Sequence, residues 1–244
     1  MTKSEASWAA IRMEAARRGI ISVPPLWPAR YRKDCPKSAY RYLTECCWTF
    51  NEADSKVELI PKKKYIRKIV RIWWQCRRSR RTIIFFKSRR LLVSWILCGL
   101  ELWAGGLKPE KSVLVGVTYE MAYEHVWRYW HLYEELRARR KDFRHLRAAL
   151  KTGGDPLKQM LEKVILPNGT LFDSMTSTGQ AFQGTGFTRV RMEEPSHYKN
   201  PGYTYGQALR VTEGKAESQG GHVYLVANAF PNQGWQDLKK CAGE

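Results

Sequence analysis

The residues best suited to chemistry in this 244-residue chain begin with a basic segment in its first half. Lys87, Ser88, Arg89 and Arg90 stand in a row, and Ser94 follows at the start of an apolar stretch. A β-branched and aromatic run precedes them, so the pattern predicts a strand, a basic loop and a helix. This arrangement directs backbone N–H groups and the positive end of a helix dipole toward an anion. The segment therefore predicts phosphate binding, with a basic turn before a core helix as the alternative.

An acidic pair, Glu193 and Glu194, stands at the end of another apolar run, which begins near Thr188. Adjacent carboxylates suit phosphoryl transfer, because one can hold Mg²⁺ or its water while the other orients and deprotonates the attacking water. The alternative is that both glutamates belong to a solvated loop that follows a strand.

Alternating strands and helices must position these segments. Strands are predicted over residues 82–86, 112–117, 188–192 and 222–226. A helix is expected after each of the first two strands, and the second helix should run from Tyr119 to about Leu150. Asn168 and Gly169 lie between two further short apolar runs and predict a hairpin. The sequence therefore indicates an α/β fold with a mainly parallel sheet covered by helices on both faces.

The N-terminal quarter of the chain has a different composition. Residues 1–20 read as an amphipathic helix, and residues 28–60 are rich in Tyr, Trp and Cys. Pro61 then opens a basic helix that should reach about Arg80. We therefore expect residues 1–60 to form a helical cap that packs on a core domain over residues 61–244.

The overall charge is strongly positive, with 42 Lys and Arg against 23 Asp and Glu, a formal net charge of +19. This excess favours a polyanionic partner, nucleic acid before membrane, over a basic protein without such a partner. No apolar run is long enough for a membrane span, and the N-terminus has no signal-peptide core, so a cytoplasmic location is expected. Six cysteines without CxxC spacing predict neither a metal site nor a disulfide framework.

Two basic clusters are candidates for contacting DNA phosphates, with a solvated protein face as the alternative for each. The first cluster precedes the strand at residue 82 and comprises Lys62, Lys63, Lys64, Arg67, Lys68 and Arg71. The second lies near the end of the long predicted helix and comprises Arg137, Arg139, Arg140, Lys141, Arg144 and Arg147. The second cluster is our predicted DNA-binding surface.

The basic loop resembles the deviant Walker A motif of phage large terminases, of the form K-[SA]-R-R-x-G-x-S-W. The matching residues are Lys87, Ser88, Arg89, Arg90, Ser94 and Trp95. The resemblance implies that Lys87 binds the phosphates of ATP and that Ser94 helps to hold Mg²⁺. Leu92 departs from the motif, which usually has glycine there, and we expect its side chain to crowd the phosphates.

Other segments resemble further terminase motifs in the same order. Glu193 and Glu194 resemble a Walker B motif, which implies a metal-side acid in Glu193 and a catalytic base in Glu194. The segment over residues 223–232 resembles the coupling motif and implies that Asn228 senses the γ-phosphate. Pro61 and Tyr65 stand where the adenine-side segment lies in the family.

One position departs from the family in charge. Some members have an arginine shortly before the Walker B strand, and this arginine acts on the γ-phosphate of a neighbouring subunit. This chain has Gln183 there, which carries no charge. Arg189 and Arg191 are the local candidates for supplying the missing charge.

The resemblance, over roughly residues 40–240, implies a P-loop NTPase (ASCE/RecA-like) that uses ATP and Mg²⁺. It implies the motor domain of a viral large terminase, which drives double-stranded DNA into a procapsid. The partners would be the portal protein and the small terminase subunit, with a homo-oligomeric ring at the portal and a monomer in isolation, in the host cell cytoplasm. No carboxylate cluster follows residue 232, so an isolated motor domain without a nuclease domain is expected.

Two alternatives remain from the sequence. One is a catalytically degenerate terminase-like module that docks on DNA or on the portal. The other is a helicase-like ATPase, which would require a second lobe that this chain has no room to form. Nucleotide titration with and without Mg²⁺ separates the first alternative from an active motor.

Overall fold

The computed structural model describes residues 24–51, 55–79, 82–87, 92–144, 149–152, 161–177, 186–219 and 222–228, with residues 182 and 236. The helix expected over residues 1–20 lies outside these ranges. Within them, no helix combines the length and apolar composition that a membrane crossing requires.

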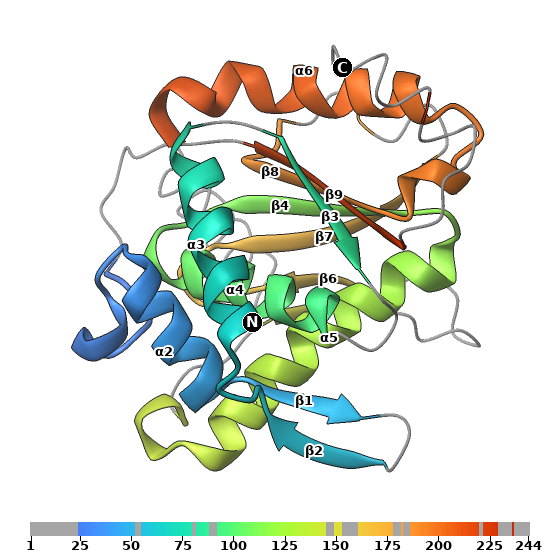
Figure 1. Ribbon diagram of the computed structural model, residues 1–244. Helices are drawn as coiled ribbons and strands as arrows, with labels where there is room; N and C mark the ends of the chain where they lie inside the picture. The colour runs from blue at the N-terminus through green and yellow to red at the C-terminus, as the bar shows by residue number, and fades with distance from the viewer. Residues whose placement is uncertain are drawn as a thin grey trace, which may run out of the picture.

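A central sheet organises the described part of the chain, with seven strands in the order β3-β9-β8-β4-β7-β6-β5 (Figure 1). The strands are β3 (Ile83–Lys87), β4 (Lys111–Gly116), β5 (Ala149–Thr152), β6 (Leu161–Ile165), β7 (Leu171–Thr176), β8 (Arg189–Glu193) and β9 (His222–Asn228). The first five strands in this order are parallel, while β6 and β5 pair antiparallel. This arrangement confirms the predicted α/β class and its mainly parallel sheet.

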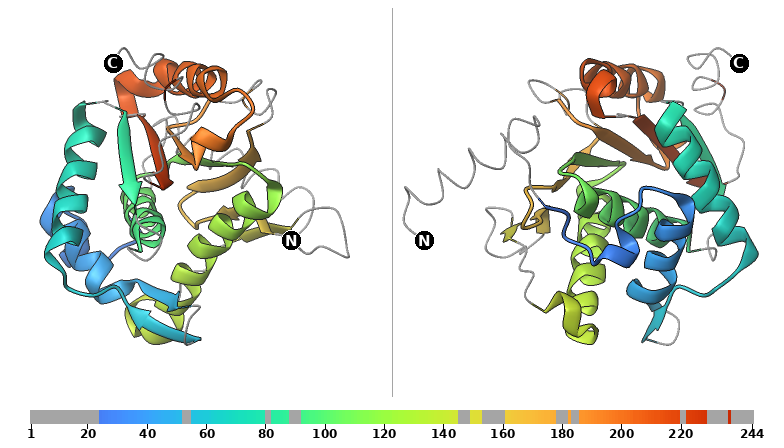
Figure 2. Two further views of the ribbon diagram at one scale, coloured as in Figure 1. Left: turned by 45° about the vertical axis from the view of Figure 1, so that its right-hand side comes forward. Right: turned by 90° about the vertical axis from the view of Figure 1, so that its left-hand side faces the viewer.

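Helices cover both faces of the sheet (Figure 2). On one face lie α4 (Val93–Leu107) and α5 (Tyr119–Arg139), and on the other lies α6 (Pro201–Gln219). Strand β9 shows how the two cores divide, because Tyr224 and Val226 pack toward α4 and α5 while Val223 and Leu225 pack toward α6. A strand buried on both faces has no polar alternation, which explains its continuous apolar sequence.

The N-terminal elements pack beside α4. They are η1 (Ala29–Tyr31), α2 (Pro36–Cys46), the antiparallel hairpin β1 (Trp48–Asn51) and β2 (Lys56–Leu59), and α3 (Lys64–Ser79). Buried side chains of α2 and α3 join the same hydrophobic cluster as α4, and the Trp73 ring of α3 stacks on Tyr224 at 6.5 Å. The segment over residues 28–60 is thus helical in part and carries a hairpin that ends near the carboxyl edge of the sheet.

Two features around α5 compare prediction with structure. The helix expected to reach about Leu150 ends at Arg139, because Arg140 is extended and residues 149–152 instead pair with β6 as an edge strand. The short helices η2 (Lys141–Phe143) and η3 (Pro195–His197) complete the set. The predicted Asn168–Gly169 hairpin is confirmed, with β6 and β7 antiparallel and Gly169 at a φ of 89°.

Candidate active site

The order of the strands brings the two candidate segments together. Strand β9 lies between β3 and β8, so the carboxyl ends of these three parallel strands are neighbours. Lys87 ends β3 in register with Asn228, and Glu193 ends β8 in register with Val226. Open α/β sheets bind ligands at this edge. Residues more than a hundred positions apart in sequence therefore meet where such a fold places its ligand.

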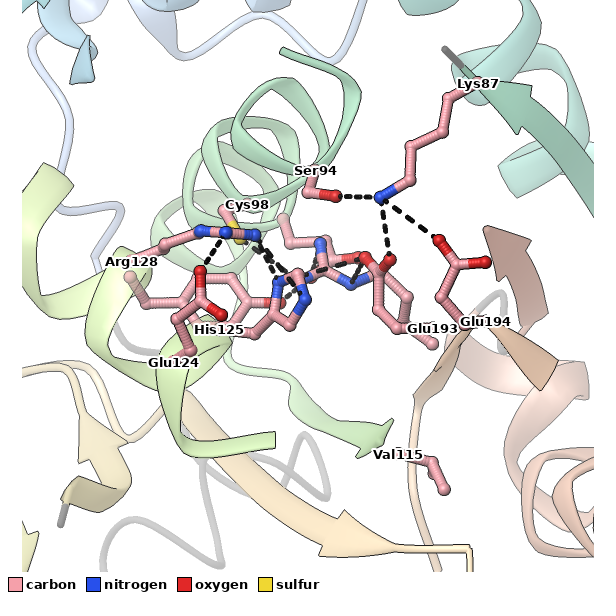
Figure 3. A network of polar contacts seen from close by, with 12 residues as sticks. Lys87, Ser94, Cys98, Val115, Glu124, His125, Arg128, Glu193 and Glu194 are labelled. Atoms are coloured by element: carbon pink, nitrogen blue, oxygen red, sulfur yellow. Dashed lines mark hydrogen bonds and ion pairs between the residues drawn. The ribbon is translucent and has the colours of Figure 1, made fainter. Parts of the chain in front are cut away.

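The Lys87 ammonium group is the centre of the site (Figure 3). Its Nζ donates to Ser94 Oγ at 2.9 Å and to Glu193 Oε2 at 3.3 Å, and it lies 3.9 Å from Glu194 Oε1. Ser94 is the second residue of α4, so its hydroxyl stands at the amino end of that helix. A hydroxyl and two carboxylates from different elements thus converge on one cation.

The backbone on both sides of this cation is in the left-handed region. Leu92, the N-cap residue of α4, has a φ of 53°, and Glu194 has a φ of 51°. Non-glycine residues reach this region at a cost of roughly 1–2 kcal/mol. The Glu194 N–H donates to the Val226 carbonyl oxygen at 2.7 Å, which fixes the turn after β8. The family's glycine at position 92 therefore suits the backbone as well as the space for phosphates.

Helix α5 contributes two residues to the site that the sequence analysis missed, His125 and Arg128. His125 Nδ1 lies 3.9 Å from Glu193 Oε1 and 2.9 Å from Arg128 Nη1. Arg128 also pairs with Glu124, one helical turn earlier. Burial lowers the pKa of His125 well below its usual value, and the positive charges of Arg128, Arg191 and Lys87 lower it further. His125 is therefore neutral near pH 7.

A buried ion network supports Glu193 from below. Arg191 Nε lies 3.5 Å from Glu193 Oε1, Arg191 Nη1 lies 3.5 Å from Glu101 Oε2, and Arg191 Nη2 donates to Cys98 Sγ at 3.1 Å. Burial alone would lower the pKa of Arg191, but Cys98, Glu101, Tyr129 and Glu193 raise it well above its usual value. Arg191 is thus a permanent cation under the site.

This network corrects the expectation that Arg189 or Arg191 could supply the charge that Gln183 lacks. Both arginines are only 1% exposed, and they pair with the buried carboxylates Glu110 and Glu101. They point toward the core because they alternate with apolar residues along β8 and share the face that packs toward α4 and α5. Neither side chain can reach a neighbouring subunit.

A cavity of about 810 Å³ opens above the Lys87 cluster. Lys87, Ser94, Glu193 and Glu194 line one side, together with residues of α4 and α5. The β1–β2 hairpin lines the opposite side with Thr49, Phe50, Asn51, Glu58 and Leu59, and Pro61 follows. Sites for ligands of drug or cofactor size have volumes of roughly 300–1,000 Å³.

The remaining predicted site residues fall in different places. Ser88, Arg89, Arg90 and Gln183 lie outside the described residues, as does the side chain of Asn228. Pro61 lines the cavity, whereas Tyr65 packs against the hydrophobic cluster of α2, α3 and α4.

The predicted DNA-binding cluster is in part neutralised within α5. Arg137 and Arg139 form ion pairs of 2.5 Å with Glu134 and Glu135. Arg140 Nη2 donates to the Tyr31 hydroxyl at 3.4 Å. The two other members, Lys141 and Arg144, are exposed.

The arrangement fits a magnesium nucleotide. Ser94 Oγ and Glu193 Oε2 both contact the Lys87 cation, and the buried Glu193 Oε1 accepts no hydrogen bond within the described part of the chain. The described residues include no group of three His, Cys, Asp or Glu that could hold a metal by themselves. Mg²⁺ usually takes one or two protein ligands and completes its shell with phosphates and water.

Comparisons with known proteins place this geometry. No family model matches the sequence, and no curated protein matches it significantly. Among solved structures, the large terminase of bacteriophage HK97 matches with a TM-score of 0.58 and 11% identity, over 79% of this chain and 37% of its own. The fold is that of a phage large terminase. The predicted resemblance is therefore confirmed for the fold, and this chain spans just over a third of the HK97 protein.

Two further terminases align less closely. The large terminase ATPase domain of Thermus phage P74-26 matches with a TM-score of 0.43 and 10% identity, over 64% of this chain and 63% of its own. The large terminase of another thermophilic bacteriophage matches with a TM-score of 0.46 and 14% identity, over 69% of this chain and 39% of its own.

Proposed function

We propose that this chain is the ATP-hydrolysing motor domain of a viral large terminase, which drives double-stranded DNA into a procapsid. The observation that carries the proposal is the convergence of Ser94, Glu193 and Glu194 on Lys87 at the carboxyl edge of a terminase-like sheet. Residues 61–244 would form the ATPase core and residues 1–60 its cap. The portal protein, the small terminase subunit and further copies of the chain are the proposed partners, in the host cytoplasm.

In this proposal the nucleotide phosphates lie against Lys87 and the amino end of α4. Ser94 and Glu193 hold Mg²⁺, which when bound neutralises charge on the phosphate oxygens. The ammonium of Lys87 then has a phosphate in place of a carboxylate as its closest counter-charge. The base and sugar extend toward the hairpin side of the cavity, where Phe50, Leu59 and Pro61 offer apolar contacts.

Glu194 is the proposed general base. Its carboxylate lines the cavity beside Lys87, and its turn is fixed by the left-handed backbone and the bond to Val226. It would take a proton from a water whose oxygen attacks the γ-phosphorus in line with the leaving oxygen. The bond from the γ-phosphorus to the bridging oxygen breaks, ADP leaves with that oxygen, and the proton passes from Glu194 to solvent.

Arg128 is the proposed second cation for the γ-phosphate. Its guanidinium lies over the Trp95 ring at 5.4 Å, its side chain is 13% exposed, and it lines the cavity. The neutral His125 and Glu124 hold it in place. Such a cation within the same chain would supply the charge that Gln183 and the buried Arg189 and Arg191 cannot.

Three variants test these roles by calorimetric ATP titration with and without Mg²⁺ and by phosphate release. Lys87→Ala should lose turnover at least ~100-fold and weaken ATP binding, because its charge acts on the phosphates. Glu194→Gln should bind ATP like the parent and lose turnover at least ~100-fold, because it removes the general base. Arg128→Gln should bind ATP and lose turnover about 10-fold or more, because it removes charge from the γ-phosphate. Parental turnover in Lys87→Ala would refute the proposed site.

A second candidate is a nucleotide-free module that docks on DNA or the portal. The Leu92 side chain favours it, because this side chain lines the cavity where the family has glycine. The same titration separates the two, since a docking module shows no Mg²⁺-dependent heat with ATP at millimolar concentration.

A further inference from the structure

The exposed face of α3 is basic along its whole length. Helix α3 contains no Asp or Glu, and it buries Ile66, Val70 and Trp73 on its inner side. Its outer side, with the two residues before it, exposes Lys62, Lys63, Lys64, Arg67, Lys68, Arg71 and Arg78. At about 1.5 Å per residue, the helical part of this stripe spans about 21 Å. Figure 2 shows α3 at the outside of the molecule in both views.

No carboxylate neutralises this face within the described part of the chain. Lys62, Lys63, Lys64, Lys68 and Arg71 form no ion pair there. The two remaining arginines lie over aromatic rings, Arg67 over Tyr40 and Arg78 over Trp74, each at 4.9 Å. A ring orders a guanidinium without cancelling its charge. The stripe therefore presents its charges to an external anion.

The second basic cluster differs in this respect. Arg137 and Arg139 are paired with glutamates of their own helix, so the end of α5 offers less free charge than the number of its arginines suggests. The structure thus separates two surfaces that the sequence left as equal candidates.

We infer that the outer face of α3 binds the phosphate backbone of duplex DNA. This inference rests on the proposed function for the choice of duplex DNA as the anion, although the face lies outside the cavity. Several unpaired cations in one line neutralise consecutive phosphates and release their counterions, which gives salt-dependent binding that does not read bases. A cargo that must move through the motor requires contacts of this kind.

The test compares two variants that lose the same number of charges. The first replaces Lys62, Lys63, Lys64, Lys68 and Arg71 with Gln. The matched control replaces Arg137, Arg139, Arg140, Lys141 and Arg144 with Gln, so that both have the same net charge. Binding of a fluorescent duplex of about 30 base pairs is measured by anisotropy between about 50 and 200 mM salt, with two unrelated sequences. Thermal unfolding verifies that each variant is folded.

The parent should bind both duplexes alike, with log K falling against log salt at a slope of about −4 to −5 if about five phosphates are neutralised. The α3 variant should lose at least ~100-fold in affinity at about 100 mM salt and most of that slope. The control should lose less than about 10-fold. Equal losses would overturn the inference in favour of net charge alone, and a larger loss in the control would place DNA on α5.

Two further measurements test the choice of DNA and the separation of this face from the cavity. Phosphatidylserine vesicles replace the duplex in the first, and binding to vesicles without binding to the duplex would overturn the choice of DNA. ATP turnover without DNA is measured in the second, where the α3 variant should match the parent. Absence of ATP turnover in the parent would refute the proposed function, while the duplex measurements would still decide whether α3 binds DNA.

Discussion

The two ends of strand β8 carry similar ion clusters with different surroundings. At the amino end, Arg189 pairs with Glu110, and Glu110 also accepts a hydrogen bond from Arg77 at 3.1 Å. At the carboxyl end, Arg191 lies 3.5 Å from Glu193, which also accepts from Lys87 at 3.3 Å. In each cluster a buried carboxylate stands between two cations. Only the second borders the cavity.

The difference lies in how completely each carboxylate is bonded. Each Glu110 oxygen accepts a hydrogen bond from an arginine, whereas Glu193 Oε1 accepts none within the described residues. Leaving a buried acceptor unpaired costs roughly 1–3 kcal/mol. A cation that binds only the folded protein recovers stability by mass action. The amino-end cluster is therefore suited to holding the fold, and the carboxyl-end cluster to binding a ligand.

The largest expected effect is on stability at the amino end. Arg189→Met should destabilise the protein by about 3 kcal/mol, because it leaves the buried Glu110 with one cation fewer. Lys87→Met should cost about 1 kcal/mol, since Lys87 is partly exposed and Arg191 still faces Glu193. Urea denaturation measures both, and phosphate release should show the opposite order of damage. Equal destabilisation by the two variants would contradict the division of roles.

The sequence predicted most of the fold and the two facing segments of the site. Apolar runs marked the strands, and Lys87 and Glu193 stood at strand ends, where parallel strands bring their carboxyl ends to one edge. The helix to Leu150 was wrong because the pairing of residues 149–152 with β6 depends on distant contacts rather than on local periodicity.

The support beneath the site could not be predicted in the same way. Arg189 and Arg191 were interpreted as available charges, since arginine is rarely buried unless it is paired. Their partners, Glu110 and Glu101, lie more than seventy residues away in sequence. His125 and Arg128 were missed for a similar reason, because only the packing of α5 places them against Glu193. Their spacing of three residues on one helix was the available signal.

A smaller effect should appear as a pH dependence of stability. The pKa of His125 is lowered by burial in the folded state, while in the unfolded chain it is near ~6.5. As pH falls from about 7.5 to 5.5, the unfolded chain takes up a proton and the folded protein does not, so stability falls. One histidine contributes at most about 1.4 kcal/mol per pH unit.

The comparison of the two ends predicts which variant removes this dependence. Glu193, Arg128, Arg191 and Lys87 face His125, and of these groups only His125 titrates near pH ~6.5. Urea midpoints at pH values of about 7.5, 6.5 and 5.5 should therefore vary less in His125→Gln than in the parent. Arg189→Met serves as the control and should keep the parent's slope. An unchanged slope in His125→Gln would assign the pH dependence to other histidines, including the half-buried His131, whose pKa burial also lowers.

The smallest expected effect concerns the strained backbone at the carboxyl edge. Replacing Leu92 with Gly or Ala removes most of the same side chain, so comparing the two isolates the backbone. In an ordinary helical position Gly is less stable than Ala by about 1 kcal/mol, as expected for Gln75→Gly against Gln75→Ala in the exposed part of α3. At the left-handed Leu92 the order should reverse, with Leu92→Gly more stable than Leu92→Ala by about 1 kcal/mol. ATP titration of the same pair then separates crowding from strain. If the Leu92 side chain crowds the phosphates, both variants should bind ATP more tightly than the parent, whereas tighter binding by Leu92→Gly alone would assign the effect to the backbone. Ala more stable than Gly at position 92 would mean that the chain enters α4 without the left-handed turn.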